Sequence, residues 1–132
     1  MSGAKPKLLI AEDDPFMISL LSKAFSEEGF EVVFANNGDE AVRQFGETDP
    51  DILVFDIMMP GKNGVDALRE IRGLPKGKDP PAIMLTNLDD APTVSAAQDL
   101  NVRAYLVKAN TQLSEIVNKV KQVLGEVTGV RD

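Results

Sequence analysis

The chain has 132 residues, of which 43% are hydrophobic, a size and composition that fit one domain with its own apolar core. It contains neither cysteine nor histidine, which excludes disulfides, thiolate or imidazole metal ligands and a serine–histidine catalytic pair. The formal net charge of −7 argues against direct nucleic-acid binding, and no apolar run approaches the length of a membrane span. Because the first residues lack the apolar segment of a signal peptide, we expect a cytoplasmic protein.

Five short apolar runs alternate with helical patterns along the chain. The runs comprise residues 8–11, 32–35, 52–55, 82–85 and 104–107. Residues 52–55 are too few for a buried helix and too apolar for a surface strand, so they predict a strand buried on both faces of a sheet. The other four runs are predicted to be further strands. We expect the domain to span residues 7–125, with a flexible tail at 1–6 and a C-terminal tail or the start of a linker at 126–132.

Apolar residues recur at helical spacing after each run. The first helix is predicted to begin after Asp14, its cap, and to end at Gly29. The second helix is expected to close at Gly46 and the third near Gly73. The five predicted inner faces are Met17, Leu20, Leu21 and Ala24; Ala41, Val42 and Phe45; Val65, Leu68 and Ile71; Val94, Ala97 and Leu100; and Leu113, Ile116, Val117, Val120 and Leu124.

Five strands alternating with five helices predict a parallel sheet with helices on both faces, and polar residues follow its strands. Glu12 and Asp13 follow the first strand, Asp56 the third, Thr86 the fourth and Lys108 the fifth. Taken singly, these residues are typical of solvated strand ends, a turn and an exposed lysine. Their shared edge, where ligands bind in open α/β sheets, favours one site instead. We expect Asp56 to be a nucleophile that accepts a phosphoryl group.

In these positions the chain resembles the receiver domain of two-component response regulators, over roughly residues 5–125. The matching residues are Glu12-Asp13, Asp56, Met58-Met59-Pro60-Gly61, Gly64, Thr86, Tyr105 and Lys108. The resemblance implies a three-layer, doubly wound (βα)5 sandwich whose five-stranded parallel sheet has the flavodoxin-like order 2-1-3-4-5.

The resemblance also implies a chemistry for Asp56. A sensor histidine kinase or a histidine phosphotransfer protein would supply the phosphoryl group from a phosphohistidine. The reaction would require Mg²⁺ or Mn²⁺, with Asp13, Asp56 and the backbone carbonyl of Met58 as metal ligands. Glu12 would hold a metal-bound water.

By the same resemblance, Lys108 and Thr86 would contact the phosphoryl group, and Thr86 and Tyr105 would switch the binding of an output protein or domain. A half-buried ring on an edge strand is an equally good interpretation of Tyr105. Met58 and Leu88 flank the site and cannot activate a water, so we expect slow autodephosphorylation. The protein would then be a self-phosphorylating switch rather than an enzyme. Dimer formation on activation stays open.

Two residues depart from the family pattern. Lys108 is followed by Ala109, whereas the family usually has a proline with a cis peptide bond. A cis bond before a residue other than proline costs about 3–4 kcal/mol, so either the loop bears that strain or the bond is trans and the lysine approaches differently. Asn87 follows Thr86 where most members have a small residue, and we expect it to narrow the mouth of the pocket.

Three other interpretations are weighed against the switch. A phosphatase with an aspartate nucleophile would carry a second acid two residues later, where this chain has Met58. A flavodoxin-like flavin carrier would need a Ser/Thr/Gly-rich loop at residues 12–15, which are Glu-Asp-Asp-Pro here. A receiver module of a longer regulator, with an effector beyond residue 132, is equally compatible with the sequence. The helix before the fifth strand has almost no basic residues, which disfavours the DNA-binding subfamily.

Overall fold

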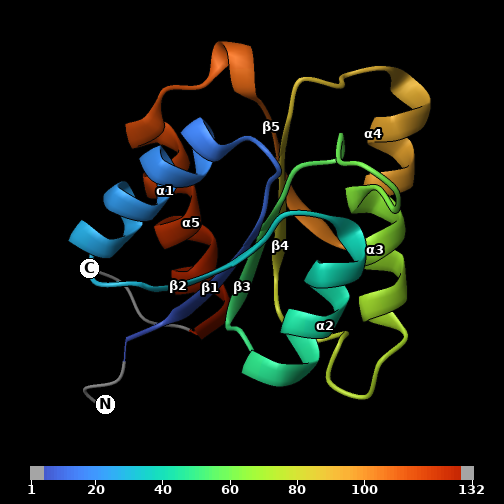
Figure 1. Cartoon of the computed structure of the whole chain (residues 1–132), viewed down its shortest axis with the longest axis horizontal. Helices are drawn as coiled ribbons and strands as arrows, with labels where there is room; N and C mark the ends of the chain where they lie inside the picture. The colour runs from blue at the N-terminus through green and yellow to red at the C-terminus, as the bar shows by residue number, and fades with distance from the viewer. Residues whose placement is uncertain (1–4, 129–132) are drawn as a thin grey trace.

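Five parallel strands form one sheet in the order β2-β1-β3-β4-β5, as predicted. The computed structural model describes residues 5–128 (Figure 1). The strands are β1 (Lys7–Ala11), β2 (Glu31–Ala35), β3 (Ile52–Phe55), β4 (Ala82–Thr86) and β5 (Val102–Val107). The helices are α1 (Pro15–Glu27), α2 (Gly38–Thr48), α3 (Gly64–Arg72), α4 (Ala91–Gln98) and α5 (Leu113–Thr128), with the short 3-10 helix η1 (Lys108–Asn110) before α5.

Helices cover both faces of the sheet: α1 and α5 lie on one face, and α2, α3 and α4 lie on the other (Figure 1). Because successive side chains of a strand point to opposite faces, Leu8 and Ile10 pack with α1 and α5, whereas Leu9 and Ala11 pack with α2 and α3. All four residues of β3 are at most 1% exposed. The prediction that this strand is buried on both faces is therefore confirmed. The edge strands β2 and β5 are mostly half-buried, because each has a neighbouring strand on one side only.

The buried face of α1 differs from the predicted one. Leu20 is 38% exposed, whereas Leu21 and Phe25 are fully buried. The ring of Phe25 meets Phe30 edge-on with 5.4 Å between centroids. The buried stripe of α1 therefore runs along Leu21 and Phe25, and Leu20 lies at its border. The expectation that Leu20 lies in the core was wrong, and Phe25 is the core residue that the pattern did not single out.

Three helix ends also differ in detail from the expected ones. Helix α2 runs through Gly46 to Thr48, and Asp49 caps it in the left-handed conformation with φ 52°. Leu100 packs inward from the turn after α4 rather than from the helix itself. Helix α5 continues to Thr128, three residues past the expected boundary at 125. Of the expected tails at 1–6 and 126–132, residues 1–4 and 129–132 lie outside the described residues.

Within residues 5–128, no helix has both the length and the apolar character needed to cross a membrane.

Candidate functional site

The carboxyl ends of four strands bring the predicted residues to one edge of the sheet, the upper edge in Figure 1. Glu12 follows β1, Asp56 follows β3, Thr86 is the last residue of β4, and Lys108 follows β5. Glu12, Asp56 and Thr86 are the buried polar or charged residues of the described chain, with exposed fractions of 2%, 5% and 0%. Burial of polar groups requires partners, so their contacts define what the site can do.

The carboxylate of Asp56 is fixed through both of its oxygens. Its Oδ1 accepts a hydrogen bond from the backbone N–H of Met58 at 3.1 Å, and its Oδ2 accepts one from Lys108 Nζ at 2.7 Å. The backbone of Asp56 is held as well, since its N–H donates to the carbonyl of Ala11 at 2.9 Å. Gly64 passes so close that a Cβ there would lie 2.0 Å from the carbonyl oxygen of Asp56. The start of α3 therefore packs directly against the backbone that carries this carboxylate.

Lys108 joins two buried carboxylates. Its Nζ lies 2.6 Å from Glu12 Oε1 and 2.7 Å from Asp56 Oδ2, while Glu12 Oε2 accepts the backbone N–H of Asp14 at 3.1 Å. Burial raises the pKa of Glu12, and the hydrogen bonds from Lys108 and Asp14 oppose that rise. Burial lowers the pKa of Lys108, but its hydrogen bonds to Asp56 and Glu12 outweigh burial, so the pKa ends above the usual value for lysine. Lys108 is therefore the resident cation of the site.

An exposed third carboxylate completes the acidic cluster. Oxygens of Glu12, Asp13 and Asp56 all lie within 4.8 Å of one another. Against these three negative charges stands the single ammonium group of Lys108, which leaves a formal surplus of two negative charges. Hard carboxylate oxygens in this number are the ligands that Mg²⁺ prefers, and the charge surplus matches a divalent cation. The donor set thus fits the expected metal.

Thr86 and Tyr105 are linked to the site through Leu88. The hydroxyl of Thr86 accepts the backbone N–H of Leu88 at 3.3 Å, and the hydroxyl of Tyr105 donates to the carbonyl of Leu88. Burial, with the nearby acids Asp90 and Asp89, raises the pKa of Tyr105. Among residues 5–128, neither hydroxyl bonds the Asp56 carboxylate directly. The structure therefore brings Glu12, Asp13, Asp56 and Lys108 together, with Thr86 and Tyr105 beside them.

The peptide bond between Lys108 and Ala109 is trans, because the described chain contains no cis peptide bond. Residues 108–110 form η1, and from this turn Lys108 still reaches Asp56. The backbone N–H of Ala109 donates to Asn87 Oδ1 at 2.9 Å. Of the two alternatives for this bond, the trans one is correct. The two departures from the family pattern therefore contact each other, which neither residue indicates when taken alone.

Asp14 has the role predicted for it. Its Oδ1 accepts the backbone N–H of Phe16 at 3.0 Å, so it caps α1 and takes no part in the acidic cluster.

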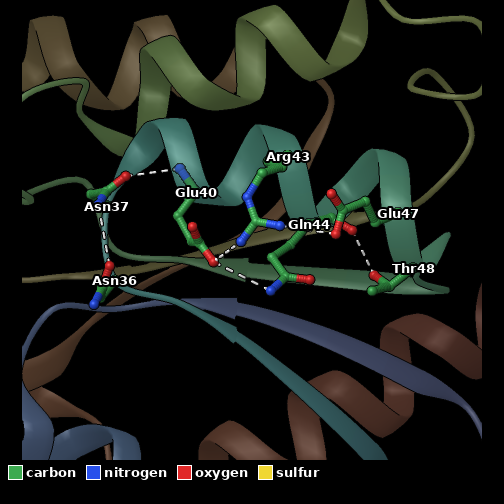
Figure 2. Close-up of polar contacts among 7 residues, drawn as sticks. All are labelled: Asn36, Asn37, Glu40, Arg43, Gln44, Glu47 and Thr48. Carbon is green, nitrogen blue, oxygen red and sulfur yellow. Dashed lines mark hydrogen bonds and ion pairs between the residues drawn. The ribbon is translucent and has the colours of Figure 1, made fainter.

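A hollow outside the acidic cluster lies beside the start of α2. It is an open depression of about 510 Å³, lined by Asn37, Asp39, Glu40, Arg43, Pro60 and Gly61. Figure 2 shows the contacts of three of these residues: Asn37 accepts the backbone N–H of Glu40 at 2.8 Å, and Arg43 pairs with Glu40 and with Glu47. Because two carboxylates already hold Arg43, we interpret this depression as a solvated surface.

Comparisons with known proteins agree with this geometry. The family model of the response regulator receiver domain matches residues 8–121. A probable transcriptional regulator ycf27 of Guillardia theta is 35% identical over 120 residues, which cover 91% of this chain and 46% of that protein. The transcriptional regulatory protein CpxR of Klebsiella pneumoniae subsp. pneumoniae (strain HS11286) is 33% identical over 118 residues, 89% of this chain and 49% of that protein. The chain thus spans about half the length of these curated relatives.

Solved structures of response regulator proteins are similar to this one. A putative response regulator from Chloroflexus aurantiacus J-10-fl superposes with a TM-score of 0.83 at 31% identity, covering 92% of this chain and 98% of that one. The CheX-CheY-BeF3-Mg+2 complex from Borrelia burgdorferi contains a chain with a TM-score of 0.83 at 27% identity, covering 92% of this chain and 90% of that one. The fold, the acidic edge and the match over residues 8–121 agree, and the chain belongs to the response regulator receiver domain family.

Proposed function

We propose that this receiver domain is a phosphorylation-dependent switch in which Asp56 accepts a phosphoryl group from a phosphohistidine. The donor is a sensor histidine kinase or a histidine phosphotransfer protein in the cytoplasm. One observation carries the proposal: the carboxylate of Asp56 lies 2.7 Å from the ammonium group of Lys108 and within 4.8 Å of the acids Glu12 and Asp13. A cation on one side and metal ligands on the other are what a phosphoryl acceptor requires.

The transfer step follows from the chemistry of a carboxylate nucleophile. An oxygen of Asp56 attacks phosphorus and forms a P–O bond while the P–N bond to the donor histidine breaks. The other ring nitrogen of the phosphohistidine carries a proton, so the nitrogen that was bonded to phosphorus keeps the electron pair of the broken bond and the ring leaves as neutral imidazole. The product is an acyl phosphate on Asp56. Lys108 is placed to offset the negative charge that the phosphoryl oxygens bring to the site.

Mg²⁺ or Mn²⁺ suits the acidic cluster. Asp13, Asp56 and the backbone carbonyl of Met58 are the proposed metal ligands, and Glu12 is proposed to hold a metal-bound water. When bound, the metal neutralises charge on the phosphoryl oxygens and so lowers the repulsion between them and the carboxylates. The surplus of two negative charges in the cluster supports this assignment.

The switch itself is proposed to use Thr86 and Tyr105. Moving a two-state equilibrium from 1:99 to 99:1 needs about 5.5 kcal/mol of differential binding. Hydrogen bonds to charged groups are worth roughly 1.5–3 kcal/mol each. Contacts of Thr86 and Lys108 with the phosphoryl group reach that size only together. Thr86 and Tyr105 both form a hydrogen bond with the backbone of Leu88. A movement of Thr86 toward the phosphoryl group would therefore displace Leu88 and change the hydrogen bond of Tyr105.

We further propose that the protein is a switch with slow self-dephosphorylation rather than a phosphatase. A phosphatase of this chemistry uses a second acid two residues after the nucleophile, and Met58 occupies that position with its side chain 55% exposed. Leu88, the other flanking residue, is equally unable to activate a water. The output is a separate protein or a domain of the same protein. Direct nucleic-acid binding by this acidic domain is not part of the proposal.

The decisive experiment compares Asp56→Asn with the control Asp79→Asn, which changes an exposed aspartate outside the site. Both proteins are incubated with Mg²⁺ and acetyl phosphate, and the acyl phosphate is detected by intact mass spectrometry. We expect the control to be labelled like the wild type and Asp56→Asn not to be labelled. Labelling of Asp56→Asn to the wild-type extent would refute the proposal, and steady turnover of excess phosphomonoester would favour the phosphatase.

A further inference from the structure

Asn87 makes a side-chain contact that joins the two loops carrying Thr86 and Lys108. Its Oδ1 accepts the backbone N–H of Ala109 at 2.9 Å, although the two residues lie 22 positions apart in the chain. The last residue pair of the β4–β5 ladder is Thr86 opposite Val107. The contact therefore extends the pairing of β4 with β5 beyond the last residue pair of the ladder. It lies directly after Thr86 in one segment and directly after Lys108 in the other.

Lys108 needs such support because its own turn is weak. It begins η1, a 3-10 helix of three residues, and short 3-10 turns have poor hydrogen-bond geometry. Ala109 and Asn110 are exposed, so little buried apolar surface holds the turn. Thr111 closes the turn, since its backbone N–H donates to the carbonyl of Lys108 at 3.3 Å and its hydroxyl donates to the carbonyl of Val107 at 2.8 Å, but both bonds stay within residues 107–111. Among the described residues, the bond from Ala109 to Asn87 is the hydrogen bond that ties η1 to the end of β4.

The residue types at positions 87 and 109 are matched to each other. A proline at position 109 would have no N–H to donate, and it would disfavour the helical backbone of the residue before it, which is Lys108. Ala109 has the N–H, and Asn87 has a carbonyl oxygen that reaches it. A small side chain at position 87 would leave that N–H without this acceptor. The two residues by which the chain departs from the family pattern thus form one interaction.

We propose that the Asn87–Ala109 hydrogen bond acts as a clasp that holds Lys108 in place to contact Asp56, which makes Asn87 a positioning residue of the phosphoryl-acceptor site. This inference rests on the proposed function. The competing interpretation is that the bond only caps the turn. A cap would affect the stability of the protein, whereas a clasp sets where the ammonium group of Lys108 lies and how tightly the site binds a phosphoryl mimic.

The test compares Asn87→Ala with Asn110→Ala, a control in the same turn whose exposed side chain has no hydrogen bond among the described residues. The affinity for beryllofluoride in excess Mg²⁺ is measured on the full chain. The NMR signal of the Lys108 ammonium group is recorded in the absence of both beryllofluoride and Mg²⁺. We expect Asn87→Ala to bind beryllofluoride about two- to tenfold more weakly, which is the loss expected for one hydrogen bond, and to shift the ammonium signal. The control should change neither.

A second variant separates the clasp from a general loss of order. Ala109→Pro removes the donor, so adding Asn87→Ala to it should cost no further affinity if the two residues act as a pair. Faster hydrogen exchange at the Ala109 amide of Asn87→Ala shows that the bond itself is lost, whether or not the proline variant folds. Wild-type affinity and an unmoved Lys108 signal in Asn87→Ala would overturn the clasp.

A different result would refute the proposed function. If the wild type neither binds beryllofluoride nor forms an acyl phosphate, the switch is refuted. The clasp is still decided in that case by the response of the Lys108 ammonium signal to Asn87→Ala.

Discussion

Replacing Lys108 with methionine tests how much the resident cation contributes to the fold. The side chain of Lys108 is 15% exposed and lies 2.6 and 2.7 Å from two carboxylates that are 2% and 6% exposed. At an effective dielectric constant of about 20, each contact carries about 6 kcal/mol of Coulomb energy, most of which is offset by desolvation. Removing one partner of a buried ion pair typically costs about 3–5 kcal/mol, because the remaining charge has no partner. We expect Lys108→Met to lose that much unfolding free energy at neutral pH without divalent metal.

The pH dependence of this loss identifies its source. Burial already raises the pKa of Glu12, and Lys108 opposes the rise, so the substitution should raise that pKa further. An acid whose pKa is higher in the folded than in the unfolded protein destabilises the fold above the folded pKa. That penalty disappears as the pH falls through the folded pKa toward the unfolded value, near 4.5. The difference between wild type and variant should therefore be largest at neutral pH and shrink in acid.

Urea unfolding followed by circular dichroism measures this difference, in EDTA and again with Mg²⁺. Mg²⁺ should recover part of the lost stability, since a divalent cation takes the place of the missing charge between the carboxylates. The control is Lys23→Met, which changes an exposed lysine on α1 that takes part in no ion pair of the described chain. A loss below about 1 kcal/mol, typical of exposed ion pairs, or a loss that does not shrink in acid would refute the reasoning.

Two further substitutions test the rest of the site. Thr86→Ala should still form the acyl phosphate but lose one hydrogen bond to the phosphoryl group. Capture of an output partner in the presence of beryllofluoride should therefore weaken by about tenfold or more. Normal capture would contradict this. Gly64→Ala should lower the unfolding free energy by about 1–3 kcal/mol and slow labelling of Asp56, because its Cβ would meet the Asp56 carbonyl at 2.0 Å. The matched control is Gly46→Ala in α2. Its Cβ would meet nothing within 4 Å, so this variant should be slightly more stable than the wild type. Urea midpoints of the two glycine variants that shift in the same direction would contradict the packing argument.

The fold and the composition of the site could be predicted because both follow from short-range patterns. A run such as residues 52–55 can only be buried on both faces, and parallel strands place their carboxyl ends at one edge. The face of α1 could not be predicted in full, since the apolar pattern fits more than one stripe, and only the packed structure shows that the buried one contains Phe25, whose ring meets Phe30. Gly46 did not end α2, because packing of the helix outweighs the weak helix propensity of one glycine.

The contacts within the site could not be predicted from the sequence, because they depend on where side chains lie in the folded chain. That one ammonium group is shared between Glu12 and Asp56 depends on side-chain positions that no spacing encodes. The bond between Asn87 and Ala109 depends on the pairing of β4 with β5. Its signal in the sequence was indirect: two unusual residues each follow a site residue, at the ends of strands that the predicted order 2-1-3-4-5 places side by side.

The resting contacts also explain how the proposed switch can respond without first breaking its own network. A lysine ammonium group has three N–H donors, and within the described chain Glu12 and Asp56 accept from Lys108. The hydroxyl of Thr86 accepts from Leu88, which leaves its own hydrogen free to donate. One donor on each residue thus remains for a phosphoryl oxygen, and two charge-assisted bonds of roughly 1.5–3 kcal/mol each approach the 5.5 kcal/mol that a complete switch needs. Because the two contributions are needed together, the position of Lys108 relative to Thr86 is the geometric quantity on which the size of the response depends.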